Sequence, residues 1–476
     1  MFRSKIIKNT GIYTLGNLLP KIGILLLLPI ITKYLSPEEY GIVQSLVILQ
    51  TFLLILFTLA VDRAIFRLYF DFPTKNSQRD YLGSIFISHL IIACSMLFII
   101  YSFDFLFGKI YKSIPFYPYF SYFVLSVFFT SFEIIPKTYF QVTQKAKFHF
   151  LYSLSQFILR YSFVLWFVIA KDEGAEGMLK GMMYGSLILF PALLYNNFKI
   201  VNLKFKKAYI FNSLKYSFPL IPSLLAAWML NFSDRVFLER YFTTTEVGLY
   251  SLGYQIAMVV GYINQGVRKA YSPVFFSLAN YSDKSIAKPK IKKMNETILY
   301  LFVSLIFFIS VFSKEIITWF FDSQYLQAYK IIPIIALTYI FIIASSLFNL
   351  SIYQTKRTYI TMIITLFTAG INVLLNFLLI PIYSMYGAAI STLFSFMINA
   401  FLTYYYSRKE YFISLNLKSF IAYFFSLFLI AFTLLYIIKI KFILMFILKL
   451  IIIIGICFYF YIKYRKYIAD IIFKRK

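Results

Sequence analysis

The sequence predicts an all-α polytopic membrane protein, with about 14 transmembrane helices in two parallel six-helix lobes related by pseudo-twofold symmetry, plus two C-terminal helices. Three observations carry this prediction. The composition is 61% apolar and only 14% charged, whereas soluble domains are roughly half apolar and a quarter charged. Fourteen apolar stretches have lengths that suit a bilayer. The two halves of the chain also repeat one another.

The fourteen predicted spans are separated by charged and turn-rich breaks, and each holds about 20 residues, enough to cross a hydrocarbon core as a helix. They cover residues 11–32, 42–61, 82–103, 119–140, 150–170, 178–195, 216–238, 248–267, 297–313, 331–350, 359–380, 388–406, 419–438 and 442–462. We expect an N-terminal lobe at 1–210, a C-terminal lobe at 211–410, and two last helices with a basic tail at 411–476. The first span has no small-residue cleavage site, so we expect a membrane helix and not a removed signal.

The charged residues between the spans predict the orientation of the chain. Segments on the side of the N-terminus hold 32 Lys and Arg against 7 acidic residues, and the opposite segments hold 9 against 10. Positive residues mark the cytoplasmic side, so both termini are expected there. The longest inner loop, 268–296, contains KPKIKK and is expected to be a solvated loop beside anionic headgroups.

The internal repeat appears at a shift of 207 residues, where polar positions of the two halves coincide. The matched pairs are Lys33 with Arg240, Glu39 with Glu246, and Gly41 with Gly248. Gly177 and Gly387 each open the sixth helix of a half. Units with an even number of helices insert the same way up, so the repeats are parallel. Such a pair leaves a cavity between the halves that can open to either side.

No sequence motif indicates catalysis, metal binding or a phosphate-cradling loop. Cys94 and Cys457 are far apart, His89 and His149 stand outside any Cys/His cluster, and no GxxxxGK[ST] or GxGxxG occurs. We therefore expect no cofactor and no metal. The predicted outer loops are too short for a glycan polymerase or ligase, so an enzyme is not expected. Basic residues punctuate apolar runs and form no single patch, which argues against a nucleic-acid partner.

Eight charges fall inside predicted spans, where each costs roughly 2.5–3.5 kcal/mol on insertion scales. They are Lys21, Glu133, Lys137, Arg160, Lys180, Asp234, Arg235 and Lys449. Their sum is +4. An uncompensated positive interior is costly unless the partner arrives with the substrate, so the sum indicates an anionic cargo. Ammonium and guanidinium groups suit phosphate.

Some of these charges have a structural interpretation that stays open. Glu133 and Lys137 are spaced i,i+4 and can pair on one helix face. Asp234 and Arg235 are sequence neighbours that point in different directions, so each is expected to need its own partner. Snorkelling or helix contacts are expected for the remaining pair, Lys180 and Lys449.

The candidate binding residues are basic and lie in or beside the predicted spans. Lys21, next to the helix-kinking Pro20, and Arg160 have no acid within one turn. Arg63 and Arg268 lie at the inner ends of corresponding helices, where positive-inside flanking is the alternative. The predicted substrate-binding set is Lys21, Arg63, Lys137, Arg160, Arg235 and Arg268. Sugar contacts or helix packing are alternatives for Tyr13, Asn17, Asn231, Asn372 and Asn376.

Several stretches resemble polysaccharide flippases of the multidrug/oligosaccharidyl-lipid/polysaccharide exporter superfamily. In the N-terminal half they are NLLPKIGILLLLPIITKYLSPEEYGIVQSLVILQTF and LAVDRAIFR. In the C-terminal half they are YSFPLIPSLLAAWMLNFSDRVFLERYFTTTEVGLYSLGYQIA and INVLLNFLLIPIYSMYGAAISTLFSF. One departure is Ser384-Met385 before Tyr386-Gly387, where the family more often has a basic residue and Gly. It leaves the fold expectation unchanged.

The resemblance implies a multi-pass protein of the bacterial cytoplasmic membrane that works by alternating access. It would move undecaprenyl-diphosphate-linked oligosaccharide repeat units to the outer leaflet for surface polysaccharides such as O-antigen. It implies membrane lipids, a polysaccharide polymerase and a chain-length regulator as partners. Ion or proton antiport is the energy source that the family suggests.

Two transporter alternatives remain, a small-molecule or drug exporter of the same fold and a peptidoglycan-precursor lipid flippase. Drug and cation antiporters of the superfamily usually rely on membrane acids, whereas bases dominate here. Peptidoglycan-precursor flippases carry several arginines in the first helix, where this chain has a single Lys21. A membrane glycan enzyme is disfavoured by the short outer loops.

Overall fold

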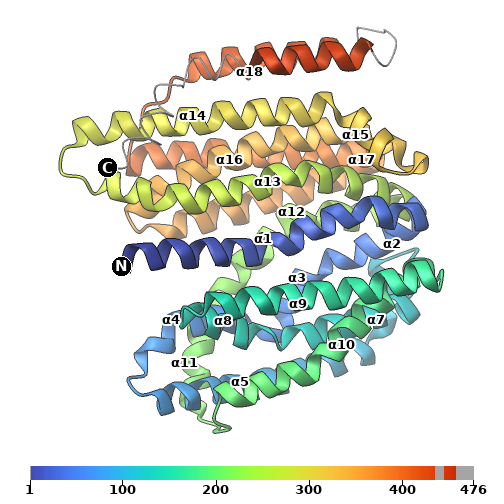
Figure 1. The fold of residues 1–476 in the computed structure, drawn as a ribbon, viewed down its shortest axis with the longest axis vertical. Helices are drawn as coiled ribbons and strands as arrows, with labels where there is room; N and C mark the ends of the chain where they lie inside the picture. The colour runs from blue at the N-terminus through green and yellow to red at the C-terminus, as the bar shows by residue number, and fades with distance from the viewer. Residues whose placement is uncertain (1, 435–443, 457–476) are drawn as a thin grey trace.

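The computed structural model describes residues 2–434 and 444–456, and every regular element within these ranges is a helix. Two lobes lie one above the other along the long axis of the molecule, with α1 at their boundary (Figure 1). We name the end at which α1 begins the inner end and the opposite end the outer end, following the predicted orientation. The all-helical, two-lobe prediction is confirmed for the described residues.

The N-terminal lobe forms the lower half of Figure 1. Its main helices are α1 (Phe2–Tyr34), α2 (Pro37–Val47), α3 (Leu49–Thr58), α4 (Val61–Leu68), α5 (Lys75–Ser102), α7 (Ser121–Ser131), α8 (Ile134–Val142), α9 (Ala146–Leu165) and α10 (Gly174–Ile200). Shorter elements join them: η1 (Tyr69–Asp71), η2 (Asp104–Leu106), α6 (Phe107–Ile110), η3 (Phe116–Phe120) and η4 (Trp166–Ala170). α11 (Lys207–Ser217) packs against α4 and α5. Residues 207–217 therefore pack with helices of the N-terminal lobe.

The C-terminal lobe forms the upper half of Figure 1. Its elements are η5 (Phe218–Leu220), α12 (Ile221–Tyr241), α13 (Thr244–Ala279), α14 (Lys284–Val311), α15 (Ser313–Phe320), η6 (Ser323–Lys330), α16 (Ile332–Gln354) and α17 (Thr358–Glu410). Helix α18 (Leu417–Phe432) packs against α14 and lies at the top of Figure 1. A last described helical segment, Leu444–Ile456, follows it.

Each of the fourteen predicted spans falls on a helix, although 435–438 of the thirteenth, 442–443 and 457–462 of the fourteenth, and the predicted tail lie outside the described residues. Nine helices of the described chain are long and apolar enough to cross a membrane, counting α17 as one. Ser384, with φ 50° and ψ −130°, divides α17 into two legs that match the predicted spans 359–380 and 388–406. Helices α12 and α13 run beside the others, since α12 packs against α17 and α13 packs against α2, α14 and α16.

The predicted inner loop 268–296 is wrong, because most of it is helical. Helix α13 continues to Ala279 and α14 already begins at Lys284, so the two helices project together beyond the other helices at the inner end (Figure 1). Ala287 and Ile291 are buried while most lysines around them are exposed. Apolar contacts on one face therefore stabilise a helix in this segment, although its charge alone suggested a loop.

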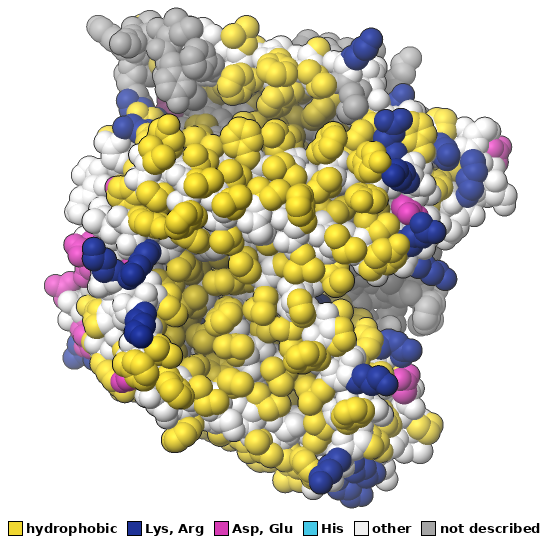
Figure 2. Space-filling view, turned by 180° about the vertical axis from the view of Figure 1, so that it is seen from behind, with side chains coloured by type: hydrophobic (Ala, Val, Ile, Leu, Met, Phe, Trp, Pro, Cys, Tyr) yellow, Lys and Arg dark blue, Asp and Glu magenta, His cyan; other side chains and the backbone are white. Residues whose placement is uncertain are grey.

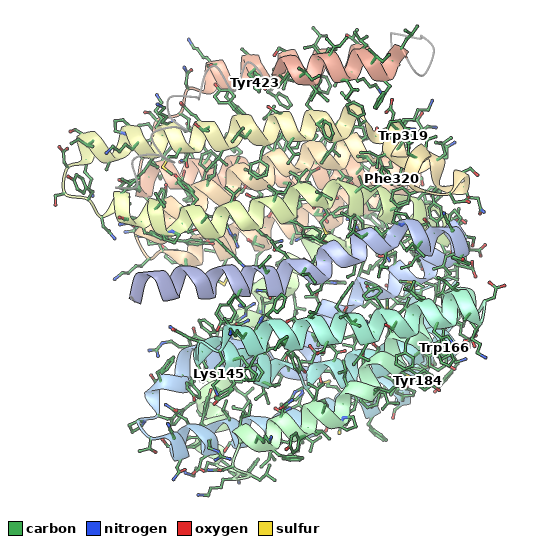
Figure 3. The ribbon with its side chains drawn as sticks, in the orientation of Figure 1. Lys145, Trp166, Tyr184, Trp319, Phe320 and Tyr423 are labelled. Carbon is green, nitrogen blue, oxygen red and sulfur yellow. The ribbon has the colours of Figure 1, made fainter. Side chains whose placement is uncertain are left out.

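The surface supports placement in a membrane. Apolar side chains cover a broad area of the face in Figure 2, and charged side chains gather at the two ends of the helices. Figure 3 places Trp166 and Tyr184 of one lobe, and Trp319 and Phe320 of the other, toward the outer end, with Lys145 near the inner end. Trp166, Trp319 and Phe320 are exposed, and exposed aromatic side chains near the ends of the helices are typical of a membrane–water interface.

The helix of the second predicted span, 42–61, is interrupted between α3 and α4. Leu59 and Ala60 both have left-handed backbone, with φ 47° and 56°. The hydroxyl of Thr58 accepts the Ala60 N–H at 3.3 Å. The Phe57 carbonyl lies 3.1 Å from Nδ1 of the buried His89, which therefore satisfies backbone exposed by the break.

The connection between the lobes is fastened to α5 through the buried Asp80. Its carboxylate accepts hydrogen bonds from Asn202 at 2.9 Å, Lys206 at 3.2 Å and Lys204 at 3.4 Å. The hydrogen bond to Asp80 raises the pKa of Lys206. The same carboxylate thus holds the basic segment that precedes α11 against the N-terminal lobe.

The outer halves of the lobes are joined where α2 crosses α13. At this crossing Gly41 faces Gly248 and the two backbones touch, since a Cβ on either glycine would collide with carbonyl groups of the other helix. The side-chain amide of Gln255 on α13 donates to Tyr40 Oη at 2.9 Å and to Gln44 Oε1 at 3.1 Å.

Two reciprocal contacts extend this outer closure, and we call them the outer clasps. In the first, the buried Glu239 at the end of α12 accepts the backbone N–H groups of Lys112 and Ser113, at 3.0 and 2.6 Å. In the second, the Tyr325 hydroxyl in η6 donates to the Leu35 carbonyl just beyond α1, at 2.8 Å. Each lobe therefore sends an outer loop onto the first long helix of the other lobe.

Candidate functional site

The N-terminal lobe contains a polar cavity of about 410 Å³, which we call the cation cavity. Helices α1, α8 and α9 supply its cations, Glu133 directly precedes α8, and α2, α3, α7 and α10 complete the wall. Its charged and amide side chains are Asn17, Lys21, Gln50, Glu133, Lys137, Gln156 and Arg160. The structure thus brings together three of the six predicted binding residues, from positions up to 139 residues apart.

Lys21 reaches from α1 toward the C-terminal lobe. Its ammonium donates to Gln265 Oε1 on α13 at 3.2 Å and lies 5.3 Å from the centre of the Tyr262 ring. Pro20 precedes it within α1 and also lines the cavity. The ammonium is therefore held at the boundary of the lobes by a neutral acceptor and an aromatic face, so its charge is not neutralised by these contacts.

Arg160 is positioned by close packing of α9 on α10. A Cβ at Gly185 would lie 2.5 Å from Arg160 Cα, and a Cβ at Gly181 would lie 2.6 Å from Val164 Cα. Small residues at four-residue spacing allow such approach between membrane helices. The guanidinium has a long contact of 3.5 Å from Nη2 to Ser126 Oγ, and its Nε lacks a partner within the described chain. Arg160 thus keeps donors for a further ligand.

Lys137 and Glu133 form the ion pair that their spacing predicts. The Nζ–Oε2 distance is 2.5 Å, and Lys137 also donates to Gln156 Oε1 at 3.0 Å. Glu133 is buried and, among the residues that the structure describes, carries the only carboxylate that lines the cation cavity. Lys21, Lys137, Arg160 and Glu133 together leave a net charge of +2.

The ion pairs of the structure separate the eight membrane charges into those with an oppositely charged partner and those without one. Besides Lys137–Glu133 and Arg235–Asp234, Lys180 pairs with Glu173 at 2.9 Å and Lys449 with Glu315 at 2.7 Å. Glu173 and Glu315 lie between the predicted spans, so the sum of +4 counts Lys180 and Lys449 without the carboxylates that pair with them. Lys21 and Arg160 are the two membrane charges for which no carboxylate lies within 4.0 Å in the described part of the chain, and both line the cation cavity.

A second cavity, of about 390 Å³, lies between the lobes at α3, α4 and α12, and we call it the interlobe cavity. Its polar and aromatic lining residues are Thr51, Thr58, Asp62, Arg63, Trp228, Asn231 and Phe232. Arg63 Nε lies 3.3 Å from Asp62 Oδ2, and the Arg63 side chain is 58% exposed. The predicted candidate Arg63 is thus in a cavity, but beside a carboxylate and apart from Lys21 and Arg160.

The remaining two candidates line neither cavity. Arg235 is buried in the C-terminal lobe, where Nη1 lies 3.1 Å from Asp234 Oδ1 and the guanidinium lies 4.2 Å from the Tyr254 ring centre. Asp234 and Arg235 pair with each other, which the sequence did not predict, because the long arginine side chain folds back to its neighbour. Each also has the separate partner that was expected: Asp234 accepts from the Tyr250 hydroxyl, and Arg235 donates to Ser251 Oγ at 3.3 Å. Arg268 is exposed on α13.

The predicted sugar contacts also divide by position. Asn17 lines the cation cavity and Asn231 the interlobe cavity. Tyr13 donates to the Phe140 carbonyl at 2.9 Å. Asn372 and Asn376 are buried in a network with Ser233 and Ser395, which fits helix packing.

Sequence reasoning missed Gln265 and Gln156, which hold the two ammonium groups, and Trp228 at the interlobe cavity. Neutral amides in apolar helices are a usable signal, because an unpaired amide is costly in a membrane. For Trp228 the sequence offers no such signal, since a tryptophan in an apolar helix usually packs against its neighbours.

Comparison with known proteins gives two family matches. A family described as "Polysaccharide biosynthesis protein" matches residues 6–279, and the family MatE matches residues 219–378. A protein of the Lsg locus of Haemophilus influenzae is 26% identical over 336 residues, covering 67% of this chain and 78% of that protein.

Solved structures of two kinds share the fold. The lipid II flippase MurJ, in an inward closed conformation, superposes with a TM-score of 0.75 at 16% identity, over 96% of this chain and 99% of that chain. An inward-facing multidrug resistance MATE family transporter of the MOP superfamily gives a TM-score of 0.66 at 13% identity, over 83% and 94%. These likenesses establish the two-lobe architecture.

Proposed function

The chain belongs to the polysaccharide biosynthesis protein family of MOP-superfamily flippases, and from this premise we propose that it translocates undecaprenyl-diphosphate-linked oligosaccharide units. It is a multi-pass membrane transporter, and the proposal concerns its cargo and direction. The cargo would move from the cytoplasmic to the outer leaflet of the bacterial cytoplasmic membrane for surface polysaccharide synthesis. No catalytic step is part of this proposal.

The observation that carries the proposal is the pair of unneutralised cations in the cation cavity. Lys21 and Arg160 lie in a membrane-embedded cavity of net charge +2, and Arg160 has an unused buried N–H. Such an arrangement is costly without an anion. A diphosphate supplies two adjacent anionic groups, which accept charge-assisted hydrogen bonds from both side chains.

The closure of the molecule supports loading from the inner end. The side-chain hydrogen bonds that join the lobes in the described chain lie in the outer half, at Gln255, Glu239 and Tyr325, or near the middle, at Trp228 and Lys21. Release at the outer end therefore requires the outer clasps and the α2–α13 crossing to part while the inner halves close. In this orientation both termini are cytoplasmic. We also propose a polysaccharide polymerase and a chain-length regulator as partners at the membrane.

The test uses a strain that needs this gene for its surface glycan. Lys21→Ala, Lys21→Gln, Arg160→Ala and Arg160→Gln should each reduce export by tenfold or more, since a lost buried charge contact costs about 1.5–3 kcal/mol. Lys180→Ala is the matched control, because its ammonium already pairs with Glu173 near the outer end. Full export by the Lys21 and Arg160 variants at normal protein levels would remove the basis of the proposal.

Purified protein in vesicles separates the cargo classes. Translocation of an undecaprenyl-diphosphate saccharide isolated from the host supports the proposal. Translocation confined to a peptidoglycan precursor, or drug-dependent growth without a glycan defect, would instead favour one of the alternatives.

A further inference from the structure

The interlobe cavity is next to the cation cavity but differs from it in chemistry. The two share Leu54 on α3 and Ile134 on α8, which line both. The cation cavity holds three cations against one carboxylate, whereas in the interlobe cavity Arg63 is paired with Asp62 beside aromatic rings, an amide and hydroxyl groups. In a lipid-linked saccharide the first sugar is bonded directly to the diphosphate. A diphosphate in the first cavity would therefore bring this sugar to the second.

Trp228 forms a fixed aromatic wall of the interlobe cavity. Its indole N–H donates to the Ile48 carbonyl of the other lobe at 2.7 Å, and its ring lies 5.2 Å from that of Phe52. These contacts set the orientation of the ring, and Phe232 follows one turn later on the same helix face. The electron-rich face of an aromatic ring suits the C–H edges of a pyranose.

Polar groups surround this aromatic wall on both lobes. Asn231, three residues after Trp228, donates to the Ala227 carbonyl at 2.7 Å, which fixes its amide. Asp62 and Arg63 approach from α4. A few oriented polar groups within an otherwise apolar pocket give specificity for the hydroxyl pattern of a ligand.

The backbone break at Leu59–Ala60 is what brings Asp62 and Arg63 to this cavity. Two consecutive non-glycine residues in left-handed backbone cost stability, and such strain is concentrated at functional sites. Ala60 itself lines the cavity. A continuous helix from α3 into α4 would have satisfied its own backbone without the Thr58 and His89 contacts.

We propose that the interlobe cavity is the saccharide subsite for the sugar nearest the diphosphate, with Trp228 as its specificity-determining residue. This inference rests on the proposed function, because it assumes a diphosphate-linked cargo in the cation cavity. It assigns different parts of one ligand to different lobes: the diphosphate to the N-terminal lobe and the first sugar to the contact between lobes. Rocking of the lobes would then change the two subsites together.

The test measures binding of two probes to the full-length protein in lipid nanodiscs. One probe is undecaprenyl diphosphate and the other is the undecaprenyl-diphosphate saccharide isolated from the host. Wild-type protein should bind the saccharide-bearing probe roughly tenfold more tightly, the ratio expected for one aromatic contact with supporting hydrogen bonds. Trp228→Ala should abolish this ratio while binding of undecaprenyl diphosphate stays within twofold, and Trp228→Phe should restore part of it. Asn231→Leu should lower the ratio.

The matched control is Trp166→Ala, which removes an exposed tryptophan at the outer end and should leave both affinities unchanged. Lys21→Ala should weaken both probes equally. If wild-type protein binds neither probe, the proposed function fails. If it binds both equally, or if Trp228→Ala keeps the wild-type ratio, the saccharide subsite fails while the diphosphate site stands.

Discussion

Gly41 and Gly248 occupy equivalent places in the two halves of the sequence, 207 residues apart, and they meet backbone to backbone where α2 crosses α13. Their pairing places the pseudo-twofold axis at the outer closure of the molecule. Other equivalent positions behave alike: the Glu39 carboxylate abuts Gly174, and the Glu246 carboxylate accepts a hydrogen bond from Ser384. Gly174 and Ser384 both have positive φ. Each lobe therefore places the acid of its second helix against the start of its sixth.

The glycine crossing predicts that Gly41→Ala weakens the closed outer face. The new Cβ would collide with the Thr244 carbonyl, so α2 and α13 must separate. In protein with Cys94 and Cys457 replaced by Ser, Gln44→Cys is a buried reporter of this separation. We expect Gly41→Ala to raise its maleimide labelling roughly tenfold, for a loss of about 1.4 kcal/mol in the closed state.

The control for this measurement is Gly266→Ala, because a Cβ there meets nothing within 4 Å. It lies on the same α13 and should leave labelling unchanged. Equal labelling of Gly41→Ala and the unsubstituted reporter would show that the crossing does not hold the outer face closed.

The outer clasps should also govern this accessibility, with unequal strength. Glu239→Ala removes a buried carboxylate that accepts two backbone N–H groups, and hydrogen bonds to charged groups contribute roughly 1.5–3 kcal/mol each. Tyr325→Phe removes one neutral hydrogen bond, worth about 1 kcal/mol. Labelling of Gln44→Cys should therefore rise more in Glu239→Ala than in Tyr325→Phe, and Glu239→Gln should lie between. The reverse order would contradict the assignment of Glu239 as the stronger clasp.

The sequence predicted what depends on local pattern. Hydropathy located the spans, and the i,i+4 spacing of Glu133 and Lys137 predicted their ion pair. Lys449 and Glu315 are 134 residues apart, so no local pattern could indicate that they pair. Glu315 lies just beyond the predicted span 297–313, so the sequence placed it between spans. The sequence therefore overestimated the uncompensated charge, although it did select Lys21 and Arg160.

The two cavities could not be predicted from the sequence, for a different reason. Their shapes depend on breaks in the helices, and Leu59–Ala60 contains neither Gly nor Pro to signal one. The left-handed turn there is held by tertiary contacts such as that of His89 with the Phe57 carbonyl. Because the sequence does not reveal that break, it could place Arg63 at the inner end of a helix but could not predict that Arg63 lines the interlobe cavity.

The buried Lys449–Glu315 pair predicts a strong coupling between the last described helix and α15. Lys449→Met leaves an unpaired carboxylate in an apolar site and should destabilise the protein by about 3–5 kcal/mol. Replacing both residues, as Lys449→Met with Glu315→Leu, should recover most of that loss, because apolar groups then fill the site. Thermal unfolding in detergent measures both changes. A double variant as unstable as Lys449→Met would contradict a simple charge-burial cause.

The position of Arg160 depends on Gly185. This dependence can be tested with a substitution that retains every cation of the cavity. A Cβ at Gly185 would lie 2.5 Å from Arg160 Cα, so Gly185→Ala must push α9 away from α10 and displace the guanidinium. We expect export of surface glycan to fall roughly tenfold, as for a misplaced binding group. Gly370→Ala, which meets nothing within 4 Å, is the control. Normal export by Gly185→Ala at normal protein levels would show that Arg160 need not be held so closely, and that its charge alone matters.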